Sequence, residues 1–241
     1  MGAADNIETA RVLYTALHSL ETEWFGPNPA PSKAGLEEMR RLQPAFKRIG
    51  EDCHLVANNC LRTPSPWHAA LVLGGIQRQM LGSRRHCLFR GQAVPGWDLL
   101  STHARAPDQR AAHRAVQAFC ALLANVWRAA DHEVVTPAVV HVGTAQHYGL
   151  ATPLLDFTPD PAVAVHFADD RRFPGEMARV FMLTLDQAIS LNARVILPPP
   201  FVERLYIQRG VFIEPPSRHD SLAMKDQLMA VEFPIDPSFP P

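Results

Sequence analysis

The chain has 241 residues, a length that suits one large domain or a domain with an added helical segment. Hydrophobic residues make up 47% and charged residues 20%, which allows a proper core and excludes global disorder. The formal net charge of -1 excludes a protein wrapped in basic surface, although it leaves room for a local basic groove.

The spacing of cysteine and histidine bears on metal binding, and the distribution of apolar residues bears on cellular location. The four cysteines form no CxxC pair and match no zinc spacing, and the 11 histidines show no ligand spacing. The sequence therefore predicts no metal. The N-terminus lacks a basic-then-apolar signal, and no apolar run reaches about 18 residues. We expect a cytoplasmic protein without a membrane partner, although an effector exported without a cleaved signal would look the same.

The first third of the chain has helical patterning. Residues 5–24 carry apolar side chains at helical spacing, and a Gly- and Pro-rich break follows. Ser32 is placed to cap a second helix over 33–62, which Pro44 should kink or split. A third helix is expected over 66–81, apolar on most faces. The sequence thus predicts a helical N-terminal region, 1–82.

Strands and helices are mixed after the boundary near residue 82. We expect Asp160 to cap the 161–168 helix, because Pro161 occupies the favoured first position. The 219–235 segment should form a helix and then a final strand. The expected strands are 86–92, 154–158, 179–185, 195–197, 203–208 and 211–214, and the other expected helices are 107–130 and 137–148. The fold class is therefore α+β, with a second domain over 83–241.

The most informative stretch runs from Thr144 to Ala168. It keeps polar and titratable side chains in an apolar and small-residue background, which indicates either a buried hydrogen-bond network or a site. These side chains are Gln146, His147, Tyr148, Asp156 and Thr158.

Several separated motifs resemble the FRG domain family, named for its Phe-Arg-Gly motif. They occur in the family's order over residues 83–215, and a C-terminal extension follows. The motifs are Phe89-Arg90-Gly91-Gln92, Trp97, Arg105, Gln146-His147-Tyr148-Gly149, Thr152, Leu154-Leu155-Asp156-Phe157-Thr158, Pro161-x-x-Ala164-x-x-Phe167-Ala168, Arg204, Gln208, Gly210 and Phe212. The chain departs from the family at Ala151 and Pro153, which flank Thr152 where many members have Pro and Arg, and at Phe157, which replaces a Trp.

The order of these motifs is similar to that of the ADP-ribosyltransferase superfamily. That resemblance implies a helical N-terminal region packed on a mixed, mainly antiparallel split β-sheet core, and a mono-ADP-ribosyltransferase-like enzyme that consumes NAD as its substrate. It implies catalytic roles for Arg90, Thr158 and Glu203. Cofactor contacts would come from Arg90, Gly91, Gln92, Arg105, His147, Tyr148, Asp156 and Gln208.

The roles of single residues have plainer alternatives. Arg90 and Asp156 could form a structural ion pair, since buried charges persist only when paired. His147 and Tyr148 could be core residues with satisfied hydrogen bonds. Thr158 could cap the next helix. Glu203 could be exposed and inert, which leaves Asp156 as a second candidate carboxylate.

The function has alternatives too. The chain could be a non-catalytic module that binds a nucleotide or a partner segment, or an NAD hydrolase that uses water as acceptor. The acceptor of a transferase could be a protein or a nucleic acid. A toxin or phage-defence setting, with a neutralising antitoxin or regulatory protein, follows from analogy of fold.

Overall fold

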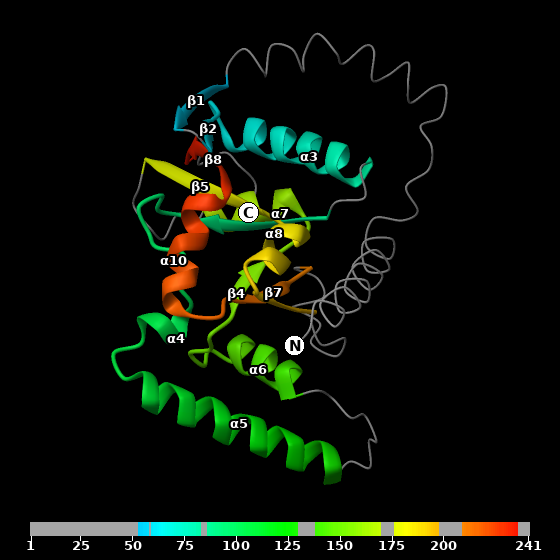
Figure 1. Cartoon of the computed structure of the whole chain (residues 1–241), viewed down its shortest axis with the longest axis vertical. Helices are drawn as coiled ribbons and strands as arrows, with labels where there is room; N and C mark the ends of the chain where they lie inside the picture. The colour runs from blue at the N-terminus through cyan, green and yellow to red at the C-terminus, as the bar shows by residue number, and fades with distance from the viewer. Residues whose placement is uncertain are drawn as a thin grey trace. The chain divides into compact units, whose positions relative to one another are not determined.

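We describe the protein from a computed structural model, in which the chain forms two compact units (Figure 1). The structure describes residues 53–57, 59–82, 86–129, 138–169, 176–197 and 209–235. Unit 1 combines residues 1–97, 160–183 and 228–241, and unit 2 combines 98–159 and 184–227. Each unit is therefore assembled from separate stretches of sequence. The expected boundary near residue 82 stays a prediction.

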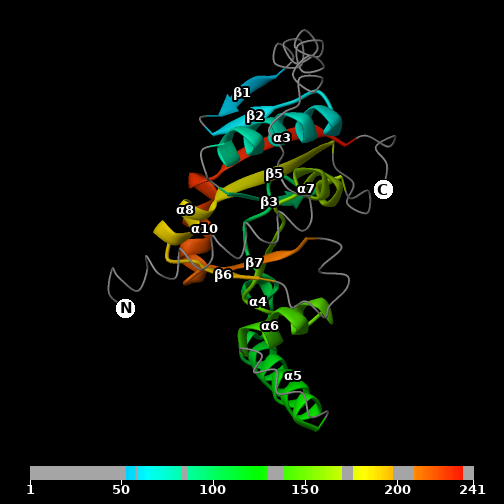
Figure 2. The same ribbon diagram turned by 90° about the vertical axis from the view of Figure 1, so that its right-hand side faces the viewer.

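Unit 1 is built on a five-stranded sheet. Strands β2 and β8 run parallel, whereas β1 pairs with β2, and β5 with β8, in antiparallel fashion. Figure 2 shows the central strands side by side. In spatial order the strands are β1 (His54–Ala57), β2 (Cys60–Arg62), β8 (Met229–Pro234), β5 (Met177–Thr184) and β3 (Cys87–Gln92).

Two helices cover one face of this sheet. Helix α3 (Pro66–Gly82) contacts β8, and helix α7 (Pro161–Ala168) contacts both α3 and β3. Strand side chains alternate between faces, so every second residue of β3, β5 and β8 joins the core under the helices. The fully buried members of this core are Ala69, Leu73, Cys87, Phe89, Ala164, Val165, Ala168, Ala178, Val180, Val231 and Phe233.

Residues 54–57 and 60–62 correct the expectation of a helix over 33–62. They form strands β1 and β2, and β2 pairs in register with β8, Cys60 opposite Ala230. Strand preference depends on neighbouring strands more than on intrinsic propensity, and this neighbour lies far away in the sequence. The rest of that helix, and the expected 5–24 helix, lie outside the described residues.

The start of α7 agrees with its sequence signals. The Asp160 carboxylate accepts hydrogen bonds from the backbone nitrogens of Ala162, at 2.9 Å, and Val163, at 3.4 Å, and Pro161 lies in the first turn. Two otherwise unpaired helix donors are thereby satisfied. This cap orients α7 across the sheet.

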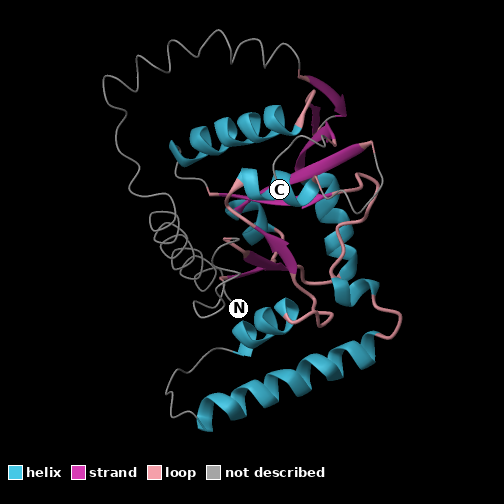
Figure 3. Cartoon of the chain, turned by 180° about the vertical axis from the view of Figure 1, so that it is seen from behind, coloured by secondary structure: helices cyan, strands magenta, loops and turns pink. Residues whose placement is uncertain are grey.

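Unit 2 contains a three-stranded antiparallel sheet and several helices (Figure 3). Phe212 on the central strand is fully buried with Leu154 and Ile196. The strands, in spatial order, are β4 (Leu155–Phe157), β7 (Val211–Glu214) and β6 (Arg194–Ile196), and the helices are α4 (Thr102–Arg105), α5 (Gln109–Ala129), α6 (Ala138–His147), α8 (Leu185–Ser190) and α10 (Arg218–Gln227).

The α+β class is confirmed, with a mixed sheet in one unit and an antiparallel sheet in the other. The two short helices α4 and α8 were not expected from the sequence, and each begins at a side-chain cap, Ser101 and Thr184. The expected strand over 203–208 lies outside the described residues. None of the described helices is long and apolar enough to cross a membrane.

Candidate functional site

Strand β3 carries the Phe-Arg-Gly motif with its side chains on alternate faces. Phe89 is buried in the core beneath the helices of unit 1. Alternation therefore places Arg90 and Gln92 on the opposite face of the sheet, where Arg90 is half-buried and Gln92 is 5% exposed. A half-buried guanidinium on a sheet has restricted rotamers, which suits it to orienting an anion or holding a carboxylate.

Gly91 faces α7. A Cβ atom at this position would lie 2.1 Å from the carbonyl oxygen of Ala164 and 2.7 Å from the backbone nitrogen of Ala168. The helix backbone occupies that space, so close packing between strand and helix gives a physical reason for glycine here. The role of Gly91 in ligand binding stays a prediction.

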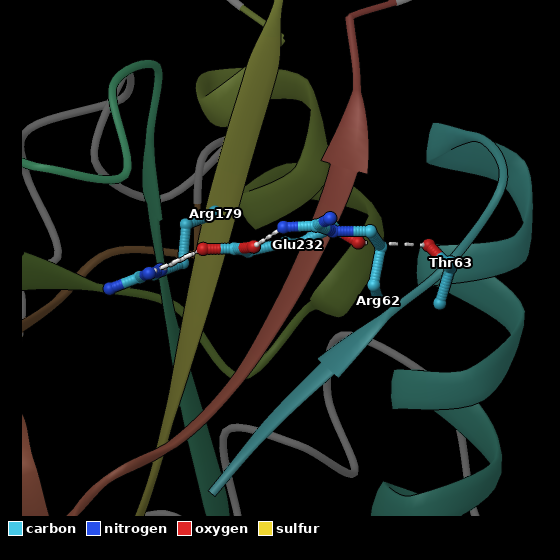
Figure 4. Close-up of polar contacts among 4 residues, drawn as sticks. All are labelled: Arg62, Thr63, Arg179 and Glu232. Atoms are coloured by element: carbon cyan, nitrogen blue, oxygen red, sulfur yellow. Dashed lines mark hydrogen bonds and ion pairs between the residues drawn. The ribbon is translucent and has the colours of Figure 1, made fainter. Parts of the chain in front are cut away.

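The same face of the sheet holds a charged cluster that the sequence reasoning missed. Glu232 on β8 lies opposite Arg62 on β2 and opposite Arg179 on β5, so three adjacent strands contribute one residue each. The Arg62 Nη2 atom donates to Oε2 at 3.0 Å and the Arg179 Nε atom donates to Oε1 at 3.0 Å (Figure 4). Arg179 Nη2 also donates to Oε1.

The surroundings of Glu232 favour its ionised form. Burial alone would raise the pKa of this carboxyl, but the hydrogen bonds and charges of Arg179 and Arg62 outweigh burial and hold its pKa below the usual value. The Arg179 guanidinium also lies 5.6 Å from the centre of the Phe181 ring. The one signal in the sequence is a lone Glu in the apolar run that forms β8.

In unit 2, three motif residues form a hydrogen-bonded chain. The Gln146 amide nitrogen donates to Asp156 Oδ1 at 2.5 Å, and the Thr152 hydroxyl donates to Gln146 Oε1. Thr152 is 0% exposed, whereas Asp156 is exposed between two buried strand neighbours. These hydrogen bonds thus connect the buried Thr152 hydroxyl to the exposed Asp156 carboxylate, and the Gln146 amide orients that carboxylate.

Thr152 also connects helix α4 to this hydrogen-bonded network. The backbone nitrogen of Thr152 donates to the Thr102 hydroxyl at 3.2 Å, and the backbone nitrogen of His103 donates to the Thr152 carbonyl at 3.1 Å. The His103 and His113 rings meet edge to face, with centroids 6.4 Å apart. Thr152 is therefore the residue around which the polar part of unit 2 is organised.

The other expected site residues of unit 2 differ in exposure. Thr158 is 4% exposed, and Arg105 is exposed at the end of α4. His147, in the last turn of α6, is half-buried with its ring 5.5 Å from that of Tyr148. Tyr148 is 70% exposed, and its ring lies 5.6 Å from Phe119 on α5.

The structure brings the expected site residues together in two groups. Arg90, Gly91 and Gln92 share β3 in unit 1, whereas in unit 2 Asp156 is joined to Gln146 and Thr152, which were motif residues without an expected site role. Glu203 and Gln208 lie outside the described residues. Within the described residues, no group of three or more His, Cys, Asp or Glu side chains is placed to hold a metal ion.

Comparison with protein families bears on the same motifs. Residues 85–176 match the model of the FRG domain, a stretch that contains the Phe-Arg-Gly strand, Gln146, Asp156 and helix α7 but ends before Arg204 and Gln208. No curated protein and no solved structure matches the chain. Residues 85–176 thus identify this chain as one that carries an FRG domain.

Proposed function

We propose that the chain is a mono-ADP-ribosyltransferase-like enzyme that cleaves NAD at the bond between nicotinamide and ribose. The fold likeness to ADP-ribosyltransferases belongs to this proposal, and its basis is the order of the FRG motifs along the chain. In this function Arg90 binds the pyrophosphate, because a guanidinium can pair with two phosphate oxygens at once.

The observation that carries the proposal is the carboxylate of Asp156. It is exposed, and the Gln146 amide holds one of its oxygens while Thr152 holds the amide in turn. Cleavage of a glycosidic bond passes through an oxocarbenium-like state, which an oriented carboxylate stabilises without reorganising. We assign this electrostatic role to Asp156, with Glu203 as the second candidate.

The other motif residues have supporting roles in this proposal. Thr158 offers a hydroxyl to the nicotinamide ribose. The other residues assigned to NAD binding are His147, Tyr148, Arg105 and Gln208. The acceptor is a protein or a nucleic acid, and the setting is a cytoplasmic toxin or phage-defence system with its own neutralising partner. If water is the acceptor, the same cofactor site makes the chain an NAD hydrolase.

The test is nicotinamide release from NAD by the purified full chain, alone and with cell lysate as acceptor. Asp156→Asn should lower the rate at least a hundredfold while NAD still binds, since only the transition state loses its stabilisation. Arg90→Ala should weaken NAD binding itself. Arg194→Ala, which removes a surface guanidinium 65% exposed, is the matched control and should leave both quantities unchanged.

The same observation is compatible with a second function. Gln146, Thr152 and Asp156 hydrogen-bond to one another, as a network with a purely structural role also would. A non-catalytic module that binds a nucleotide or a partner segment is then the alternative. Calorimetric NAD binding that depends on Arg90, without nicotinamide release, would support this module. If the chain neither binds NAD nor releases nicotinamide from it, NAD is not the ligand in either function.

A further inference from the structure

Helix α5 has an apolar face wider than the part its own unit covers. Val116 is 7% exposed and Phe119 is half-buried, yet Leu122 is 62% exposed and Val126 is 55% exposed. Successive helix residues are rotated by about 100°. Leu122 and Val126 therefore lie on an exposed strip beside the buried side of α5. The strip continues toward the start of α5 through the exposed residues Ala111, Ala115 and Ala118.

Arginine side chains border this strip on one side. Arg110 and Arg114 are exposed, lie one turn apart on the same side of α5, and make no ion pair within the described part of the chain. The sequence of α5 contains no acidic residue from Gln109 to Ala129. The strip is thus apolar and its border carries positive charge, while the Asp108 carboxylate lies at the helix start, where it accepts from the Ala111 backbone nitrogen at 2.9 Å.

An aromatic pair borders the strip on the other side. The Tyr148 ring, just after α6, lies 5.6 Å from Phe119 on α5, and Tyr148 is 70% exposed. Exposed tyrosine and leucine side chains grouped together are typical of surfaces that bind other proteins. The α5 strip is defined here by Leu122, Val126 and the alanines at 111, 115 and 118, and Tyr148 lies at its border.

We propose that the α5 strip docks an amphipathic α-helix of a partner protein whose flanks carry glutamate or aspartate. The strip residues at 111, 115, 118, 122 and 126 are three or four positions apart, which is the spacing that meshes with a second helix lying alongside. An acidic flank on the partner would pair with Arg110 and Arg114 and set its orientation.

The charge pattern separates this partner from other occupants. A second copy of this chain would bring the same arginines to the interface, with no acid on α5 to oppose them. A membrane surface favours helices whose apolar face carries large side chains, whereas much of the α5 strip is alanine. Small residues instead allow close approach of another helix. The acidic partner helix fits both observations.

The experiment uses the full chain and two labelled helical peptides of about 20 residues, each with a Leu and Ala seam. One peptide carries Glu on both flanks and the other carries Lys. Fluorescence anisotropy should show binding of the Glu peptide at least tenfold tighter than of the Lys peptide. The Arg110→Glu, Arg114→Glu double variant should reverse this preference.

Leu122→Asp should weaken binding of the Glu peptide at least tenfold, because it places a charge in the centre of the apolar strip. Leu71→Asp is the matched control, since Leu71 is an exposed leucine (47%) on α3, and it should leave the affinity unchanged. Both positions are exposed, so circular dichroism should show that both variants fold.

Three results would overturn the proposal. One is equal or absent binding of the two peptides by the unmodified chain. Another is self-association in light scattering that Leu122→Asp abolishes, which would make a second copy the occupant. The third is binding of the chain, but not of Leu122→Asp, to phosphatidylserine vesicles with no preference for the Glu peptide.

Discussion

Glu232 and Arg179 lie directly opposite each other on adjacent antiparallel strands, and two guanidinium nitrogens of Arg179 donate to one carboxylate oxygen of Glu232. The other carboxylate oxygen accepts from Arg62 on the parallel strand β2. One buried carboxylate therefore joins three strands whose segments are far apart in the sequence. This arrangement has consequences for stability.

Glu232→Gln should lower the free energy of unfolding by about 2–4 kcal/mol, because it leaves two arginines without their shared counter-charge in a site that is 6% exposed. Urea denaturation measures the change. Glu214→Gln is the control, since its partner Arg194 is 65% exposed and such surface pairs contribute at most about 1 kcal/mol. Equal losses for the two variants would contradict the prediction.

The advantage of the natural chain over Glu232→Gln should depend on pH. The arginines hold the pKa of Glu232 below its ordinary value near 4.5, so folding is favoured wherever the unfolded carboxyl would already be ionised. The advantage should be complete above about pH 5. It should shrink as pH falls below 4.5 and through the lowered pKa of the folded state. Denaturation curves recorded from pH 7 down to acid should show this direction and no other.

Gly91→Ala should destabilise unit 1 by about 2 kcal/mol or more, because the new methyl group meets the backbone of α7 at 2.1 Å. Gly96→Ala is the control: a Cβ there has nothing within 4 Å and should change the melting temperature little. A folded Gly91→Ala variant with unchanged stability would show that α7 moves away easily.

Gly75→Ala should stabilise the protein by about 0.5–1 kcal/mol, since alanine is the better helix former and the unfolded chain loses freedom. Gly75 is exposed within α3, and a Cβ atom there has nothing within 4 Å. The melting temperature should therefore rise. A decrease would mean that this position contacts something the described residues do not include.

Thr152→Val should destabilise unit 2 by about 1–2 kcal/mol, because the fully buried hydroxyl donates to Gln146 and accepts from the backbone nitrogen of Leu154. Under the proposed function it should also slow nicotinamide release, since the Gln146 amide would no longer hold Asp156 in one orientation. Gln146→Glu would repel Asp156 and should slow release further. Unchanged release in both variants would detach this network from catalysis.

Elements with local signals were predictable from the sequence. Helix α7 follows from the cap at Asp160 and the proline after it, and strand β3 follows from its apolar run up to the Arg-Gly turn. Strands β1 and β2 carry no such signal. Their stability comes from pairing with β8, and the Arg62–Glu232 hydrogen bond spans 170 positions of sequence. The expected helix, which was placed from its cap at Ser32, was therefore wrong over these two strands.

The residues of the candidate site were predictable from the sequence, whereas their hydrogen-bond partners were predictable only in part. The polar residues at 146 and 156 stand out in their apolar background, and the structure joins them as a hydrogen-bonded network. That Thr152 connects this pair to Thr102 on α4 depends on chain packing that no local pattern encodes. The role of Glu232 was not predictable, because both arginines that it contacts are distant in the sequence and a single glutamate in a strand is usually exposed.

The contact between Gly91 and α7 has a consequence for how this domain can vary. Strand β3 ends at Gln92 and α7 begins at Pro161, so this strand–helix contact joins the two segments that lie on either side of residues 98–159, which belong to unit 2. Insertions or deletions within those residues leave the contact itself untouched. Residue 91, by contrast, must remain glycine, because the atoms that a Cβ would meet first are backbone atoms of residues 164 and 168. We therefore expect residues 98–159 to tolerate changes in length without loss of the contact between β3 and α7.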